Sequence, residues 1–198
     1  EGSVLYKGED IKDIGYDNYH KKDVQIIFQN YNLLNYLNAY DNILTAISIT
    51  DKKRRVNKDM LNGYLSRFGI DENKAKRKVN KLSGGEQQRV AIARAVACDG
   101  EIILADEPTG NLDPKKSNEI IKLFEKINRE EKTTIIIVTH DIETVRKHPK
   151  RTIEIKDGHI VRDKADGICD VRTTIDKADT ETISLGDIES LKLMEDDK

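Results

Sequence analysis

Two adjacent carboxylates, Asp106 and Glu107, end a short apolar run over residues 102–105. An uninterrupted apolar run of this length is typical of a strand that is covered on both faces and lies centrally in a sheet. A carboxylate at the carboxyl end of such a strand lies where open α/β sheets bind their ligands. The pair is therefore a candidate ligand site, although an isolated acidic pair at a strand end is usually only a solvated turn.

A second candidate is the start of a helix at Ser83, which two glycines and Glu86 follow. The glycines carry no side chain that would keep a ligand away, and the backbone N–H groups at a helix N-terminus bind anions, commonly phosphate. The same Ser-x-x-Glu spacing also matches a capping box, which stabilises a helix by about 1 kcal/mol. Taken alone, this stretch favours the capping box over an anion site.

The elements that position these residues alternate in type along the second half of the chain. Runs rich in β-branched or aromatic residues predict strands at residues 3–6, 24–28, 101–105 and 134–139. Helical spacing extends from Leu33 to about Ala97. Further helices are expected at residues 114–128 and from Asp141. The alternation after residue 100 predicts a parallel sheet flanked by helices, whereas the first thirty residues lean towards β structure.

Local signals predict several boundaries and core positions. Asp113 followed by Pro114 is a helix start, because the Asp side chain accepts free N–H groups and proline needs no donor there. Asp157-Gly158 predicts a tight hairpin turn. The expected core includes apolar residues with helical spacing, namely Leu61, Leu65, Phe68, Ile120, Phe124 and Ile127.

The composition excludes several classes of protein. The 198 residues carry 34 basic and 36 acidic side chains, so the net charge of −2 gives no electrostatic footprint for nucleic acid. The basic run at residues 52–55 is accordingly interpreted as a solvated face. No apolar run approaches the roughly 20 residues of a membrane-spanning helix. Cys98 and Cys169 lie far apart, which supports neither a disulfide framework nor a zinc site and favours a reducing compartment.

The residues around the second candidate resemble the signature motif of the ABC transporter ATPases. They read Leu82-Ser83-Gly84-Gly85-Glu86-Gln87-Gln88-Arg89. Four further stretches resemble motifs of the same family and follow the family's order: the Q-loop at Gln29, the Walker B strand at 102–107, the D-loop at 108–113 and the switch histidine His140. Over residues 1–162 the chain therefore resembles the ATP-binding domain of a bacterial ABC transporter.

The resemblance implies a role for each residue and implies ATP and Mg²⁺ as cofactors. Glu107 polarises the water that attacks the γ-phosphate, and His140 donates to a γ-phosphate oxygen. Asp106 holds Mg²⁺, through water, and the amide of Gln29 faces the same metal. The other implied nucleotide contacts are Ser83, Gly84, Gly85, Gln87 and Asp113.

The resemblance also implies a P-loop NTPase (RecA-like) α/β fold with an ABC-type helical subdomain. Residues 1–30 and 100–163 would form part of the RecA-like core, and residues 31–99 the helical subdomain. Residues 164–198 are expected to be an acidic tail or linker, since residues 167–198 hold nine acidic and four basic side chains, a net charge of −5.

One family motif is missing from the printed sequence. A P-loop needs G-x-x-x-x-G-K-[ST] to cradle the phosphates, and none of the glycines here is followed by lysine. We therefore expect the chain to be incomplete at its N-terminus, and expect the fragment alone to bind ATP weakly and to be inactive. A chain that lacks its first strands should have an unpaired sheet edge and exposed apolar surface, and we therefore expect poor solubility.

The partners implied by the resemblance are a second ATP-binding domain, facing the first head to tail, and a membrane permease that is either separate or fused after the ATPase. Residues 29–34 and 105–113 look most like lipoprotein-release, macrolide-export and antimicrobial-peptide-export systems, at the cytoplasmic face of the membrane. Two alternatives stay open: a non-hydrolysing regulatory or scaffold ABC module, and a soluble ABC ATPase. The intact pair Asp106-Glu107 argues against the first. A single helical subdomain, without coiled-coil insertion or tandem domain, disfavours the second.

Overall fold

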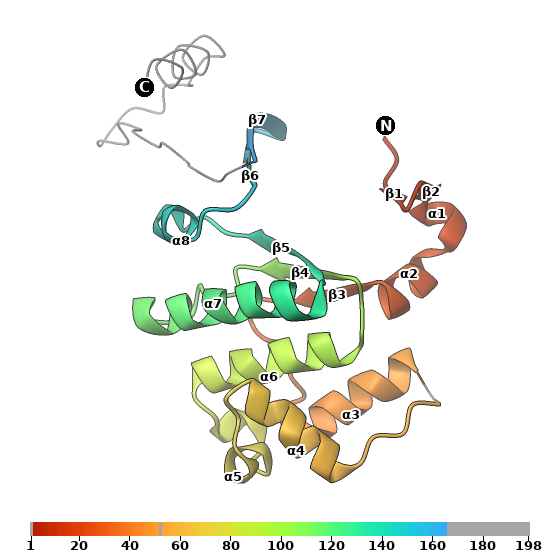
Figure 1. Ribbon diagram of the computed structural model, residues 1–198, viewed down its shortest axis with the longest axis vertical. Helices are drawn as coiled ribbons and strands as arrows, with labels where there is room; N and C mark the ends of the chain where they lie inside the picture. Colours follow the sequence, from red (N-terminus) through yellow and green to blue (C-terminus); the bar gives the residue numbers. More distant parts are fainter. Residues whose placement is uncertain (1, 52, 166–198) are drawn as a thin grey trace. The chain divides into compact units, whose positions relative to one another are not determined.

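The computed structural model describes residues 2–51 and 53–165 (Figure 1). The chain divides into two compact units, Glu1–His140 and Asp141–Lys198. All the residues that the motifs single out lie in the first unit, and each unit is described here by itself.

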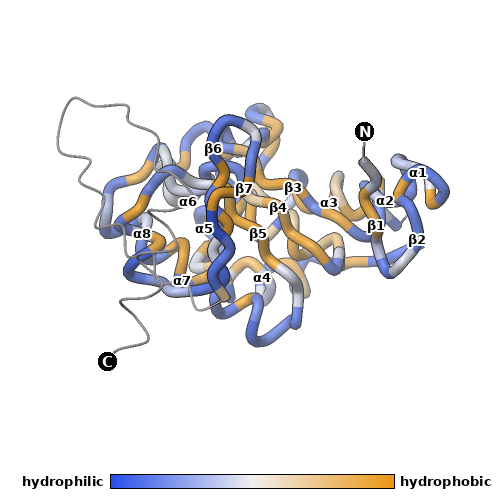
Figure 2. Tube along the Cα trace, turned by 90° about the horizontal axis from the view of Figure 1, so that it is seen from above, coloured by the Kyte–Doolittle hydropathy of each residue, from blue (hydrophilic) through white to orange (hydrophobic). Residues whose placement is uncertain are grey.

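A three-stranded parallel sheet forms the centre of the first unit. Its strands are β3 (Val24–Ile27), β4 (Ile102–Asp106) and β5 (Thr134–Val138), in the order β3-β4-β5. Figure 2 shows the three strands side by side, and their residues are mostly hydrophobic. The predicted α/β fold with a parallel sheet and a central 102–106 strand is confirmed.

The two faces of this sheet differ in burial. Helices α6 (Gly84–Ala97) and α7 (Pro114–Glu131) lie on one side of the sheet in Figure 1. On the other face Ile136 and Val138 are 50% and 60% exposed, and Leu104 is half-buried. The expectation that β4 is covered on both faces is therefore correct for one face only.

Between β3 and β4 the described chain is helical, as the apolar spacing predicts. The helices before α6 are α3 (Ala39–Thr50), α4 (Lys58–Arg67) and the short α5 (Glu72–Ala75), with a 3₁₀ turn η1 (Val79–Lys81). Each α-helix begins after a residue whose side chain accepts a backbone N–H, respectively Asn38, Asn57 and Asp71. The predicted core residues of this region, Leu61, Leu65 and Phe68, are buried.

The first residues are more helical than the sequence indicates. A hairpin of two short strands, β1 (Leu5–Tyr6) and β2 (Glu9–Asp10), comes first. The helices α1 (Ile11–Ile14) and α2 (Tyr16–Lys22) follow it. The strands predicted at residues 3–6 and 24–28 are confirmed by β1 and β3, whereas residues 11–22 between them are helical. These two helices were not predicted because neither buries a residue and so neither shows an apolar stripe.

The second unit starts with α8 (Ile142–Lys147), which Asp141 caps by accepting the N–H of Thr144 at 3.1 Å. The antiparallel strands β6 (Thr152–Lys156) and β7 (His159–Lys164) follow. Between them Asp157 and Gly158 have φ of +50° and +77°, which confirms the predicted turn. Most of the expected acidic tail, and Cys169, lie outside the described residues. Across the described ranges, no helix combines the length and apolarity that a membrane crossing requires.

Candidate functional site

Glu107 follows β4 in a left-handed backbone conformation, with φ of +44°. A non-glycine residue pays roughly 1–2 kcal/mol for this conformation, which persists only where its surroundings hold it. The N–H of Glu107 donates to the carbonyl of Val138 on β5 at 2.9 Å, and the Glu107 carbonyl accepts from Gly110 at 3.1 Å. The neighbouring strand and the following loop thus fix a sharp turn at the carboxyl end of the sheet.

The carboxylate of Glu107 is held by the two residues that follow β5. Oε1 lies 2.5 Å from His140 Nδ1 and accepts the His140 backbone N–H at 3.0 Å. Oε2 accepts the Thr139 hydroxyl at 3.3 Å. The Glu107 side chain is 18% exposed, whereas the His140 side chain is 85% exposed. The structure therefore brings the two predicted catalytic residues into direct contact, with the imidazole on the outside.

Asp106 and Gln29 lie at the same edge of the sheet. Asp106 is the exposed last residue of β4, and Gln29 comes two residues after β3, whose register pairs Ile27 with Ala105. The Gln29 carbonyl accepts the Asn111 side-chain amide at 3.1 Å. Its own amide nitrogen lies 3.1 Å from the position that a Cβ on Gly110 would take, so the missing side chain at that position leaves room for Gln29.

Asp106 and Gln29 are side chains of the kind that Mg²⁺ binds. Mg²⁺ takes oxygen ligands, and in nucleotide sites one or two protein groups suffice because water and phosphates complete its shell. Asp106 offers an exposed carboxylate, and Gln29 an exposed amide, at adjacent strand ends. Within the described ranges there is no group of three or more acidic, His or Cys side chains that could form an all-protein metal cage.

The helix start at Ser83 contains the capping box that the spacing predicts. Ser83 Oγ accepts the Glu86 N–H at 3.4 Å, while Glu86 Oε2 accepts both the Ser83 N–H at 2.8 Å and its hydroxyl at 2.9 Å. These bonds to Ser83, and the Lys74 ammonium 3.2 Å away, hold the pKa of Glu86 below its ordinary value. Ser83 itself is exposed, so a second molecule can reach it.

The two glycines after Ser83 allow close approach of other segments. A Cβ on Gly84 would lie 3.1 Å from Tyr31 Oη and 3.6 Å from Leu112 Cδ2, and a Cβ on Gly85 would lie 3.2 Å from the Lys116 side chain. The residues after Gln29, the start of α6 and the D-loop therefore meet at Gly84.

The remaining predicted contacts, Gln87 and Asp113, make local bonds. Gln87 Nε2 donates to the carbonyl of Leu82 at 2.9 Å. Asp113 caps α7 by accepting the Lys116 N–H at 3.0 Å, and its carboxylate pairs with the Lys116 ammonium at 2.7 Å. These bonds lower the pKa of Asp113. The structure thus shows both residues in helix starts, beside the loops that the motifs mark.

Sequence reasoning missed three residues that shape this region. Tyr31 and Asn32 have φ of +62° and +45°, and the guanidinium of Arg94 donates to the carbonyls of both. Nothing in the residue types announces a left-handed tyrosine. A signal for Arg94 is present, however, because it is the single charged residue in the otherwise apolar stretch 90–97.

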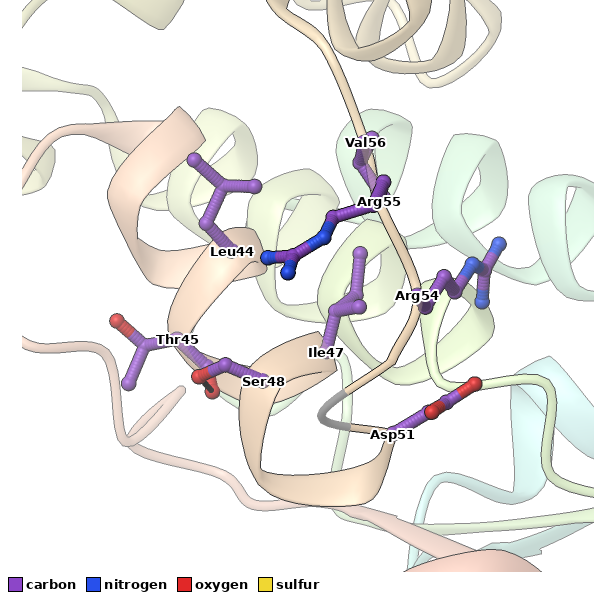
Figure 3. A pocket seen from close by; sticks show the side chains of 8 residues that line it. All are labelled: Leu44, Thr45, Ile47, Ser48, Asp51, Arg54, Arg55 and Val56. Carbon is purple, nitrogen blue, oxygen red and sulfur yellow. Dashed lines mark hydrogen bonds between the residues drawn. The ribbon is translucent and has the colours of Figure 1, made fainter.

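A separate hollow of about 380 Å³ lies on the helical part of the first unit (Figure 3). It is lined by Leu44, Thr45, Ile47, Ser48, Asp51, Arg54, Arg55 and Val56. In Figure 3 the Arg55 side chain extends towards Leu44, whereas Arg54 points the other way. Arg54 donates to the Ala97 carbonyl at 2.8 Å and pairs with Asp99. The basic run is therefore only partly a solvated face.

A family model described as "ABC transporter" matches residues 1–110, more than half of the chain. The chain belongs to the ABC transporter family. The fold prediction agrees with this membership, and the ATP-binding cassettes of the family use ATP with Mg²⁺, the two cofactors expected from the sequence.

Among curated members of this family, the ATP-binding protein YclH of Bacillus subtilis, described as uncharacterized, is 46% identical over 141 residues. That match covers 71% of this chain and 62% of YclH. The macrolide export ATP-binding/permease protein MacB of Shewanella sp. (strain ANA-3) is 42% identical over 167 residues, covering 83% of this chain and 25% of MacB. The chain thus spans less than two thirds of either relative.

A solved ABC cassette has the same fold. The dimeric ATP-binding cassette MJ0796, in a post-hydrolysis state bound to ADP and Pi, superposes with a TM-score of 0.72 at 34% identity. The superposition covers 83% of this chain and 73% of that cassette. The helices and sheet described above therefore form the ABC cassette fold.

Proposed function

We propose that this chain is an ATP-hydrolysing nucleotide-binding domain of a bacterial ABC transporter, which powers a membrane permease. The observation that carries the proposal is the contact of Glu107 with His140, 2.5 Å apart at the carboxyl edge of the sheet. A non-hydrolysing scaffold has no use for a carboxylate on a left-handed backbone, aligned by the residues that follow the neighbouring strand. This argues for turnover over the regulatory alternative.

In this proposal Glu107 acts as the base for the attacking water. Its Oε2 accepts the Thr139 hydroxyl and its Oε1 the His140 backbone N–H, with the His140 Nδ1 2.5 Å from the same oxygen, so the carboxylate is oriented before a ligand arrives. The exposed His140 ring is in a position to donate to a phosphate oxygen as charge develops there. Mg²⁺, held by Asp106 and Gln29, would neutralise phosphate charge when bound.

The exposed start of α6 is proposed to act on a second cassette. Ser83, Gly84 and Gly85 would close on ATP that the opposite protomer holds, in a head-to-tail pair. The dimeric MJ0796 cassette with ADP and Pi supports such a pairing. No glycine in the sequence precedes lysine, so the proposal assigns no lysine-bearing phosphate loop to these residues. The chain alone is accordingly expected to be inactive.

The subgroup and location rest on similarity. Residues 29–34 and 105–113 are the basis for proposing an export or lipoprotein-release system, with the permease fused or separate. The relatives include MacB, named for macrolide export, and also MetN of Clostridium tetani, which is named for methionine import and is 38% identical over 163 residues. The domain would then sit at the cytoplasmic face of the membrane, as a peripheral component. The single helical region disfavours a soluble ABC ATPase.

The experiment is Glu107→Gln in the transporter that contains this chain. Turnover of ATP should fall by about 10²- to 10⁴-fold while ATP binding persists, because glutamine keeps the size of the side chain and loses its basicity. Glu101→Gln is the control, since Glu101 precedes the other end of β4 and bonds Tyr6 and Lys7. Wild-type turnover in Glu107→Gln would remove Glu107 from this role.

A further inference from the structure

Arg94 is a half-buried guanidinium that the proposed mechanism does not use. It lies in the third turn of α6, the helix that Ser83 caps. Its Nη1 donates to the carbonyl of Asn32 at 2.5 Å and its Nη2 to the carbonyl of Tyr31 at 3.0 Å. Two bonds from one rigid guanidinium fix both the position and the orientation of this pair of peptide groups.

The peptide groups that Arg94 binds belong to an unusual turn. Tyr31 and Asn32 are consecutive non-glycine residues with positive φ. The Tyr31 N–H donates to the Phe28 carbonyl at 2.9 Å, so Gln29 lies inside the turn. Left-handed backbone at a non-glycine residue persists only where its surroundings over-determine it, and such conformations cluster at functional sites. Arg94 provides that restraint from a distant part of the sequence.

A second contact joins the same turn to the N-terminal end of α6. The Tyr31 hydroxyl reaches the start of α6, 3.1 Å from the position of a Cβ on Gly84. The turn after Gln29 thus approaches α6 at its first residue and again at Arg94. A displacement of Tyr31 and Asn32 relative to α6 would break these contacts, and Gln29 lies two residues before Tyr31 in the same turn.

We infer that Arg94 is a positioning residue, which locks the turn around Gln29 to α6 so that Gln29 and Ser83 move together. The inference rests on the proposed function, because it assigns Gln29 to the metal and Ser83 to the nucleotide of the opposite protomer. Arg94 touches neither ligand. It acts through the carbonyls of Tyr31 and Asn32.

The first test needs no nucleotide. Hydrogen exchange of this chain within the transporter that contains it is compared between wild type, Arg94→Met and Arg94→Lys, with Arg54→Met as the matched control. Arg54 also donates to a carbonyl of α6, that of Ala97, and its ion pair is with Asp99. Amides of residues 29–32 should exchange at least tenfold faster in Arg94→Met and to an intermediate degree in Arg94→Lys, with residues 84–97 unchanged. Unchanged exchange in Arg94→Met, or equal acceleration in Arg54→Met, would overturn the inference.

The second test uses the transporter that contains this chain, with Gln29→Ala as the reference. In both Gln29→Ala and Arg94→Met, kcat for ATP should fall about tenfold with KM nearly unchanged, and Arg94→Lys should recover part of the loss. Arg54→Met should retain the wild-type kcat. A low kcat in Gln29→Ala with a wild-type Arg94→Met would refute the role of Arg94. A wild-type Gln29→Ala would instead refute the proposed role of Gln29.

Discussion

The imidazole Nδ1 of His140 lies 2.5 Å from Oε1 of Glu107, although the two residues are 33 positions apart. The parallel pairing of β4 with β5 produces this contact, because it aligns Asp106 with Val138 at the ends of the two strands. Glu107, the first residue after β4, and His140, the second after β5, therefore lie at the same edge of the sheet. The backbone N–H of His140 binds the same oxygen at 3.0 Å. The imidazole is therefore one of two restraints that this residue places on the carboxylate.

Replacement of His140 by alanine should lower ATP turnover of the transporter by about 10²-fold. The reason is that the imidazole donor is lost while the backbone N–H still holds Glu107. Steady-state ATPase assays measure this effect, and His159→Ala, on the exposed hairpin of the second unit, is the control. If turnover survives in His140→Ala, the imidazole has no part in the chemistry.

Glu86 gives a pH-dependent contribution to stability. Its pKa in the folded chain lies below the ordinary value of 4.5, so folding favours the charged form, and the stabilisation is present above pH 4.5 and is lost as the pH falls through the folded pKa. Glu86→Gln should therefore lower the free energy of unfolding by about 1 kcal/mol at pH 7, through the weakened cap. The difference should shrink below pH 4.5.

Urea denaturation of wild type and Glu86→Gln at pH 7 and pH 4 measures this difference. Glu72→Gln is the control, because the Glu72 carboxylate pairs on the surface with Lys76 and caps no helix. Its effect at pH 7 should be the smaller one. An equal difference in the free energy of unfolding between wild type and Glu86→Gln at both pH values would contradict a lowered pKa of Glu86 in the folded chain.

Gly84→Ala tests the contact between α6 and the turn after Gln29. The new Cβ would lie 3.1 Å from Tyr31 Oη, so the phenol must shift, which opposes the gain of up to about 1 kcal/mol in helix propensity. In a Tyr31→Phe background the oxygen is absent, and the same substitution should be less destabilising or stabilising. A double-mutant cycle by thermal unfolding measures the coupling. Additive effects would show that Tyr31 and Gly84 do not interact.

How much of this site the sequence predicts depends on how local the signals are. The starts of α6 and α7 were predictable, because Ser83 and Asp113 cap helices within three residues of themselves. The meeting of Glu107 with His140 was predictable from strand order, since carboxyl ends of parallel strands share an edge.

Other features depend on partners far away in the chain. The left-handed turn at Tyr31 is held by Arg94, 63 positions later, and the turn at Glu107 by Val138. Propensities of single residues oppose both conformations, so no local pattern announces them. The helices α1 and α2 escaped prediction because they bury no residue and show no periodic apolar face.

The exposed face of the sheet that carries Ile136 and Val138 has a consequence for the degradation of the protein in a cell. Branched apolar side chains on a strand, presented to water, are what chaperones and proteases recognise in incompletely folded chains. We therefore expect the abundance of this polypeptide in a cell to fall while that face stays exposed to water, so that its rate of degradation would report on whether the face is covered.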